Sequence, residues 1–218
     1  MRLRSMLCVG AVAVIAPLAC QVPAHAGPSA AAESVWGVPT AAPDDLSLIV
    51  AYSFGNRIPP GADPARIEGE PGPVNEALAD AVVAARGDRD IPVFAQTTIA
   101  EVLESKYGMR DVVTIAADRN PDGTLAYLST DGVAARVAEL RGAAVSSDTV
   151  GVVAFRDHLW RATRTTAAHG FHAYAPRGIA MPDRYDPQSG QPWTTGPERY
   201  LPTDYAGRIP LLLNGLGR

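Results

Sequence analysis

The chain has 218 residues, of which 47% are hydrophobic, and a formal net charge of −4. That length provides one domain with a substantial core but is too short for two full domains. One lysine accompanies 18 arginines in an acidic chain, which argues against polybasic binding to nucleic acid or to a membrane surface.

The first 26 residues have the pattern of a secretory signal peptide. Arg2 and Arg4 precede an apolar run of 14 residues at 6–19, and Ala24-His25-Ala26 supplies a small-x-small cleavage site. A helix that spans a membrane would need about 20 apolar residues. We therefore expect an exported protein, secreted or associated with the cell envelope, that begins near Gly27 with a net charge of about −6.

Both cysteines, Cys8 and Cys20, lie in this signal region. The mature chain is therefore predicted to have no disulfide, no thiolate metal site and no cysteine nucleophile. Leu18-Ala19-Cys20 resembles a lipoprotein cleavage box, with Pro17 where that box normally has leucine. A lipid anchor at Cys20 thus stands as an alternative to simple secretion.

Residues 27–45, rich in Ala, Pro and Ser, are predicted to form a flexible spacer. From there to residue 175 short apolar runs alternate with segments of helical periodicity, which predicts an α/β domain. The expected strands are 46–53, 92–96, 112–116, 149–155 and 171–174, and the expected helices are 73–85, 98–107, 130–141 and 157–169.

Apolar strands separated by amphipathic helices predict a Rossmann-like, doubly wound parallel sheet of about five strands. Ligands in such folds bind beyond the carboxyl ends of the strands. The residues expected there are 53–56, 96–98, 118–120 and 156–161.

Residues 176–218 break this alternation. They hold many prolines and glycines, with Tyr185, Trp193, Tyr200 and Tyr205 spread among them. We expect an irregular extension that wraps the domain through its aromatic side chains, and a lid over the site is an alternative.

His158 and Arg161 are the strongest candidates for a site. They lie three residues apart in the first turns of the helix predicted after strand 149–155. Arginines near a helix N-terminus oppose the macrodipole, so an anion docked there would explain them. His158 could act as acid or base and Arg161 could bind phosphate or carboxylate. The structural alternative is that Asp157 caps the helix, His158 bonds a carbonyl and Arg161 pairs with an acid.

Two further motifs favour ordinary structure, and one expected of cofactor-binding proteins is absent. Asp118-x-Asn120-x-Asp122-Gly123 resembles the start of a calcium loop, but Ser129 occupies the position that needs a bidentate Glu, so a turn is expected. His169 and His172 fit a helix end and a strand better than a metal site. No Gly-x-Gly-x-x-Gly is present, so no NAD or FAD fingerprint is found and the cofactor stays open.

Tyr52-Ser53-Phe54-Gly55 resembles a nucleophile elbow with alanine at the first glycine position. The prolines at 59 and 60 prevent the helix that such a motif requires directly after the serine. Close approach of the backbone to a ligand at Gly55 is the favoured interpretation, with a serine hydrolase based on Ser53 as the alternative.

The chain resembles the YdcF/SanA/ElyC family of bacterial cell-envelope proteins over residues 46–176. The matching features are the Gly-containing turn after the first strand, Asn75-x-x-Leu78, and the strand, His158-x-x-Arg161-Ala162 helix, glycine and strand within VVAFRDHLWRATRTTAAHGFHAYAP. Asp118 and Thr130-Asp131 could fill the family's acidic and helix-start positions, whereas its Gly-Glu segment reads Ala95-Gln96-Thr97 here. The resemblance implies a Rossmann-like fold, a role in envelope metabolism and a nucleotide-like or S-adenosylmethionine ligand.

Our first hypothesis is therefore an exported protein that binds and transforms an anionic small molecule, phosphorylated or nucleotide-like. His158 is the candidate catalytic residue, and the candidate ligand-binding residues are Arg161, Gly55, Asn56, Asn75, Gln96, Thr98 and Asp118. The second hypothesis is a non-catalytic envelope scaffold that contacts a protein partner through its C-terminal extension.

Overall fold

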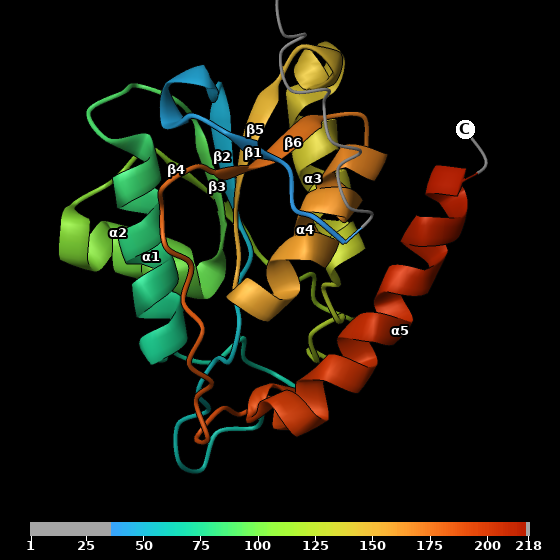
Figure 1. Ribbon diagram of the computed structural model, residues 1–218. Helices are drawn as coiled ribbons and strands as arrows, with labels where there is room; N and C mark the ends of the chain where they lie inside the picture. The colour runs from blue at the N-terminus through green and yellow to red at the C-terminus, as the bar shows by residue number, and fades with distance from the viewer. Residues whose placement is uncertain (1–35, 217–218) are drawn as a thin grey trace, which may run out of the picture. The chain divides into compact units, whose positions relative to one another are not determined.

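The computed structural model describes residues 36–216. They form an α/β fold in which five α-helices flank a single six-stranded parallel sheet, with strand order β1-β6-β5-β2-β3-β4 (Figure 1). This arrangement confirms the predicted Rossmann-like, doubly wound class. None of the helices between residues 36 and 216 combines the length and apolar character needed to cross a bilayer.

The strands are β1 (Thr40–Ala41), β2 (Leu48–Ala51), β3 (Val93–Gln96), β4 (Val112–Ile115), β5 (Thr149–Val153) and β6 (His172–Pro176). The helices are α1 (Pro73–Arg86), α2 (Thr97–Tyr107), α3 (Thr130–Arg141), α4 (Arg156–Ala168) and α5 (Pro197–Leu216). Three 3₁₀ turns, η1 (Pro43–Asp45), η2 (Gly142–Ser146) and η3 (Pro192–Thr194), lie between them.

The central strand β2 is buried on both faces, because all four of its residues are covered. Ile49 and Ala51 pack toward α1 and α2, while Leu48 and Val50 pack toward α3 and α4. This alternation follows from the two-residue period of a strand. Helices on both faces are what makes strands of this kind apolar throughout.

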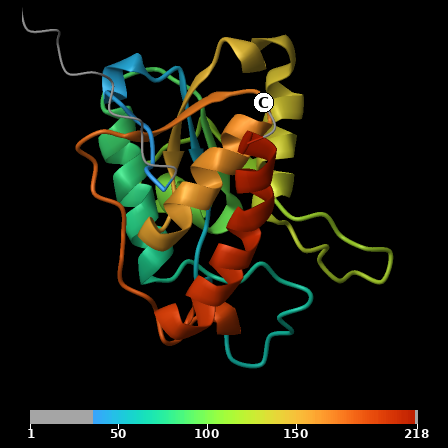
Figure 2. The same cartoon turned by 45° about the vertical axis from the view of Figure 1, so that its right-hand side comes forward.

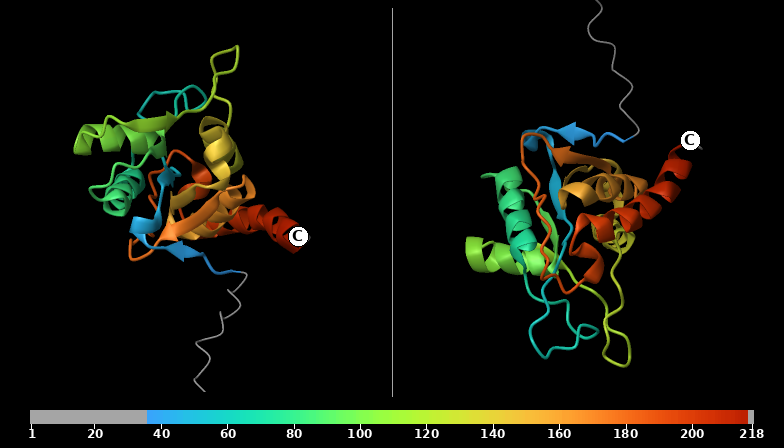
Figure 3. Two further views of the ribbon diagram at one scale, coloured as in Figure 1. Left: turned by 90° about the horizontal axis from the view of Figure 1, so that it is seen from above. Right: turned by 60° about the horizontal axis from the view of Figure 1, so that its bottom comes forward.

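The sheet reverses its winding direction at β2. From β2 the chain proceeds outward through β3 and β4, then crosses to β5 and β6 on the other side, so β3 and β5 flank β2. In doubly wound folds this switch point creates a crevice at the carboxyl ends of the strands. The loop that follows β2 extends beyond this edge at the bottom of Figure 1, and the loops that follow β2 and β4 both project at the bottom of the right panel of Figure 3.

The predicted spacer 27–45 differs from the structure at its end. Thr40 and Ala41 form β1, which pairs with β6 through the register Thr40↔Ala175. The Ala175 amide donates to the Pro39 carbonyl at 2.9 Å. This pairing adds a sixth strand at the edge of the sheet. A strand of two residues is too short to show a recognisable pattern in the sequence, so it was not predicted. Residues 27–35, the signal region and both cysteines lie outside the described residues.

The prediction of an irregular extension is wrong for residues 197–216. They form α5, the longest helix within residues 36–216, which lies beside α4 (Figure 2). Residues 177–196 are largely irregular, and there Tyr185 packs 4.6 Å from Phe155 between ring centroids. Tyr200 at the start of α5 is buried against Phe54 at 4.8 Å. Aromatic side chains therefore anchor residues 177–216 to the domain, Tyr185 from the irregular part and Tyr200 from the helix α5.

Candidate functional site

The candidate site lies beside the switch point, where the segments after β2 and β5 meet α5. The segment after β2 is held by two side chains: the Ser53 amide donates to Gln96 Oε1 and the Phe54 amide to Asn75 Oδ1, both at 2.9 Å. Gly55 follows with φ +72°, a backbone conformation that favours glycine. The chain thus turns sharply away from the sheet at a fixed place.

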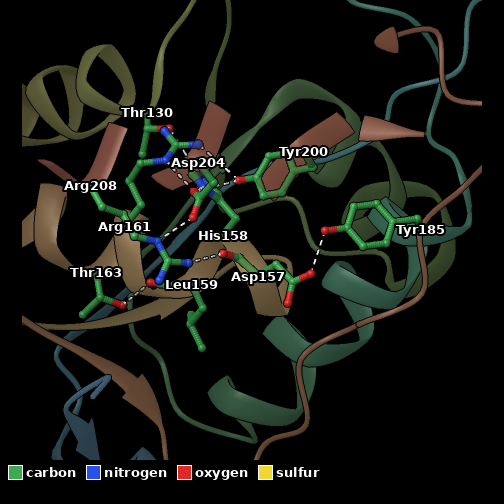
Figure 4. Close-up of polar contacts among 10 residues, drawn as sticks. All are labelled: Thr130, Asp157, His158, Leu159, Arg161, Thr163, Tyr185, Tyr200, Asp204 and Arg208. Carbon is green, nitrogen blue, oxygen red and sulfur yellow. Dashed lines mark hydrogen bonds and ion pairs between the residues drawn. The ribbon is translucent and has the colours of Figure 1, made fainter. Parts of the chain in front are cut away.

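Arg161 is at the centre of a polar cluster between α4 and α5 (Figure 4). Its Nε donates to Asp204 Oδ1 at 2.7 Å, its Nη1 to Thr130 Oγ1 at 2.8 Å and its Nη2 to the Tyr200 hydroxyl at 3.1 Å. A guanidinium has five N–H donors, so three named contacts leave two for other partners. The side chain is 21% exposed.

Asp204 is fully buried and receives two guanidinium groups. Arg161 approaches one carboxylate oxygen, and Arg208 Nε donates to the other at 2.6 Å. Burial by itself raises the pKa of Asp204, but its contacts with His158 and Arg161 outweigh that effect and hold the pKa well below its usual value. The carboxylate is therefore charged at neutral pH, and one positive charge in this trio stays uncompensated.

His158 is buried beside this trio. Its Nδ1 lies 3.7 Å from Asp204 Oδ1, too far for a hydrogen bond, and finds no hydrogen-bond partner among the described residues. Its Nε2 lies 3.4 Å from Thr130 Oγ1. Burial is the largest cause that lowers the pKa of His158, to about 4. The imidazole is thus neutral at pH 7.

The sequence did not identify Tyr200, Asp204 and Arg208 as site residues. They lie four residues apart, and so on one face of α5, which turns them toward α4. A four-residue spacing of polar side chains is typical of one face of a helix and is visible in the sequence. The prolines at 202 and 210, however, argue against a helix there.

The helix end expected to attract an anion is partly occupied by the chain itself. The Arg156 amide donates to the Pro182 carbonyl at 2.9 Å, and the His158 amide to the Phe155 carbonyl. The Tyr185 hydroxyl donates to Asp157 at 2.6 Å.

His158 and Arg161 line one small pocket, as predicted. Its volume is about 60 Å³, and its other polar walls come from Ser53, Gln96, Thr130, Gln191, Thr194 and Tyr200. We call this space the polar pocket. A larger cavity of about 480 Å³, which we call the side cavity, shares Ser53, Gln96, Tyr127, Leu128, Gln191 and Trp193 with it.

Of the other predicted ligand-binding residues, some line the two spaces and others lie beneath their walls. Asn56 lines the side cavity, but its amide is already bonded to the Glu68 carbonyl and to Asn75. Asn75 and Thr98 are buried beneath the segment after β2, where both donate to Asn56 Oδ1. Gly55 lies in the same segment and lines neither space. These residues are brought together as a support for the pocket wall.

Asp118 lies apart from both spaces. Its exposed carboxylate accepts from Arg136 Nη2 at 2.6 Å. Asp122 accepts from the amide and hydroxyl of Thr124, which makes the following segment a turn. Within residues 36–216 no group of three or more His, Cys, Asp or Glu side chains could hold a metal ion. His169 bonds Asp131 and His172 bonds the Ser146 carbonyl.

Comparison with known proteins gives no relative. No family model, no curated protein and no solved structure matches the chain. The chemistry of the polar pocket and the side cavity is therefore the basis for assigning a function.

Proposed function

We propose that this is an exported protein of the YdcF type that binds and transforms an anionic small molecule, phosphorylated or nucleotide-like, in cell-envelope metabolism. The polar pocket is the proposed place of binding. The signal-peptide pattern and the sequence resemblance support the location and the setting, and the cluster around Arg161 supports the ligand's charge.

The observation that carries this proposal is the state of Arg161. It faces the polar pocket with N–H donors to spare, in a cluster of two guanidinium groups and one carboxylate. Asp204 fixes the guanidinium through Nε, so an incoming anion meets a preorganised donor. Arginine held in this way suits phosphate or carboxylate because the planar fork can donate two parallel hydrogen bonds.

Within this proposal His158 is the residue that transfers a proton. It lines the same pocket, and because it is neutral at pH 7 it can accept one. Asp204, at 3.7 Å from Nδ1, is placed to stabilise the imidazolium that would form.

Calorimetric titration with inorganic phosphate tests the proposal. We expect binding that weakens about tenfold or more in Arg161→Gln, and less in Thr130→Val, which removes one contact of the guanidinium. Arg110→Gln is the matched control, because Arg110 is exposed and precedes β4 at the opposite edge of the sheet. Arg161→Lys keeps the positive charge beside Asp204 and is the second variant to measure if Arg161→Gln does not fold. Binding that is equal in Arg161→Gln and Arg110→Gln would refute the proposal.

One observation favours a second function, a serine hydrolase. Ser53 and His158 line the same pocket, and no described residue forms a hydrogen bond with the Ser53 hydroxyl. The nearest following helix, α1, begins only at Pro73, which differs from a nucleophile elbow. Labelling by a fluorophosphonate that disappears in Ser53→Ala and falls in His158→Gln would support this function, and absence of labelling would exclude it.

A further inference from the structure

The side cavity adjoins the polar pocket, because six residues line both. The side cavity, at about 480 Å³, is within the range of roughly 300–1,000 Å³ typical of small-molecule sites. The polar pocket, at about 60 Å³, has room for a small charged group but not for a whole ligand. A ligand bound at Arg161 would therefore extend into the side cavity.

The walls of the side cavity are mainly apolar. Ile58 and Ile67 come from the segment after β2, and Leu125 comes from the segment before α3. Tyr127 and Trp193 meet at its edge with ring centroids 6.4 Å apart and planes at 78°. These two rings are 76% and 39% exposed. Aromatic side chains left exposed at the rim of a cavity mark a place for an apolar guest.

Polar side chains are set among these apolar walls. Gln96 and Gln191 line the cavity, and among the described residues none accepts a hydrogen bond from either side-chain NH₂ group. A hydrocarbon chain would bury these amides without partners, which costs free energy. A flat ring with nitrogen or oxygen atoms at its edge could bond to them while its faces contact Tyr127 and Trp193.

Two charged side chains, one in each space, determine the orientation in which a ligand would bind. Glu68 lines the side cavity, where its Oε1 accepts from the Ala117 amide at 2.7 Å, while Arg161 lines the polar pocket. A carboxylate repels an anionic group and a guanidinium attracts it. The charged end of a ligand therefore belongs at Arg161 and an uncharged part belongs beside Glu68.

We propose that the side cavity binds a planar, uncharged ring system with polar edge atoms, carried by the ligand whose anionic group binds at Arg161. This inference rests on the proposed function and names the chemistry of the ligand's other end. A nucleobase has that chemistry, whereas a plain aryl group has the flat ring without the polar edge atoms.

Calorimetry on the full chain with matched phosphate monoesters tests the inference. Adenosine 5′-monophosphate and ribose 5-phosphate differ only in the ring, while 1-naphthyl phosphate and octyl phosphate compare an aryl with an alkyl group. We expect adenosine 5′-monophosphate to bind about tenfold more tightly than ribose 5-phosphate. A gain confined to adenosine 5′-monophosphate supports a ring with polar edge atoms, and an equal gain for 1-naphthyl phosphate would overturn the requirement for those atoms.

Trp193→Ala should remove most of that gain, so that the ratio of the affinity for adenosine 5′-monophosphate to the affinity for ribose 5-phosphate falls toward one. Trp36→Ala is the matched control, because Trp36 is 52% exposed and packs near Trp160 and Tyr205. Octyl phosphate binding as tightly as the ring-bearing probes, or a gain that persists in Trp193→Ala, would overturn the inference. If ribose 5-phosphate binds in an Arg161-dependent way without any gain from a ring, only the inference fails. If no probe depends on Arg161, the proposed function fails with it.

Discussion

Asp204 Oδ1 lies 2.7 Å from Nε of Arg161, across 43 residues of sequence. This contact joins α5 to α4 and makes the C-terminal helix a part of the polar pocket. Asp204 is fully buried, whereas Arg161 keeps part of its side chain open to the pocket. The helix therefore contributes both to stability and to the position of the guanidinium.

Asp204→Asn should destabilise the fold strongly. The neutral amide would leave two partly buried guanidinium groups without their buried carboxylate, and breaking a buried pair costs about 3–5 kcal/mol. The free energy of unfolding, measured with urea, checks this. Asp183→Asn is the matched control, because Asp183 pairs with Arg156 at the surface and such pairs contribute about 0–1 kcal/mol. Equal losses in the two variants would contradict the assignment of Asp204.

Stability should rise with pH between about 4 and 6.5. Burial lowers the pKa of His158 to about 4, while the unfolded imidazole titrates at 6.5. The unfolded state thus binds the proton first as pH falls, so this contribution is complete above pH 6.5 and is lost toward pH 4. Its size is about 3 kcal/mol. Urea unfolding at a series of pH values measures it.

His158→Gln should flatten that pH dependence, since the titrating group is gone. His172→Gln is the control because it retains His158 and changes a ring at the surface, where it bonds the Ser146 carbonyl. If the slope persists in His158→Gln, another group causes it and the buried neutral imidazole is not its source.

Tyr200→Phe should separate the two roles of this residue. The phenyl ring can keep its packing against Phe54 at 4.8 Å, but the hydroxyl contacts with Arg161 and Asp204 are lost. Hydrogen bonds to charged groups contribute about 1–3 kcal/mol, so we expect a loss of that order in urea unfolding. Tyr205→Phe, at a residue that is 51% exposed, should change stability by less than about 0.5 kcal/mol. A Tyr200→Phe protein as stable as the parent would show that only the ring matters.

The sheet and the positions of His158 and Arg161 could be predicted because they depend on local patterns. Apolar runs separated by helical periodicity specify a parallel sheet, and parallel strands all end at one edge. The residues after the central strands β2, β3 and β5 are therefore expected near the site without further information, although Asp118 after β4 lies apart from it. This reasoning placed Ser53 and Gln96 at the pocket correctly.

The helix α5 could not be predicted in the same way because proline removes a backbone donor and is normally read as the end of a helix. Pro202 and Pro210 nevertheless lie inside it. Packing explains why the helix persists: Asp204 is buried against α4, and Tyr200 is buried against Phe54 in the segment after β2. Tertiary contacts thus outweigh a poor local propensity.

The rim of the side cavity lies further beyond the reach of sequence patterns. Tyr127 and Trp193 are 66 residues apart, in an irregular segment and a single 3₁₀ turn, yet their rings are in contact. Neither segment has a periodicity that would indicate its partner. Their meeting depends on where α3 begins and where residues 177–196 run, which only the assembled fold determines.

Asn75→Leu should loosen the segment after β2 without touching the polar pocket directly. Asn75 is buried, accepts from the Phe54 amide at 2.9 Å and donates to Asn56 Oδ1 at 3.0 Å. Leucine fills a similar volume but leaves the Phe54 N–H without a partner, at a cost of about 1–3 kcal/mol. Urea unfolding measures this loss.

Because the same segment carries Ser53, phosphate binding should weaken a few-fold in Asn75→Leu under conditions where the variant is folded. Asn120→Leu is the control: Asn120 also bonds a side chain, Thr124, but in an exposed turn away from both spaces. A normal phosphate affinity in a destabilised Asn75→Leu protein would show that Asn75 supports the fold alone. An unchanged free energy of unfolding would contradict the role of the Asn75 side chain in holding the pocket wall, since a buried N–H without a hydrogen-bond partner costs free energy.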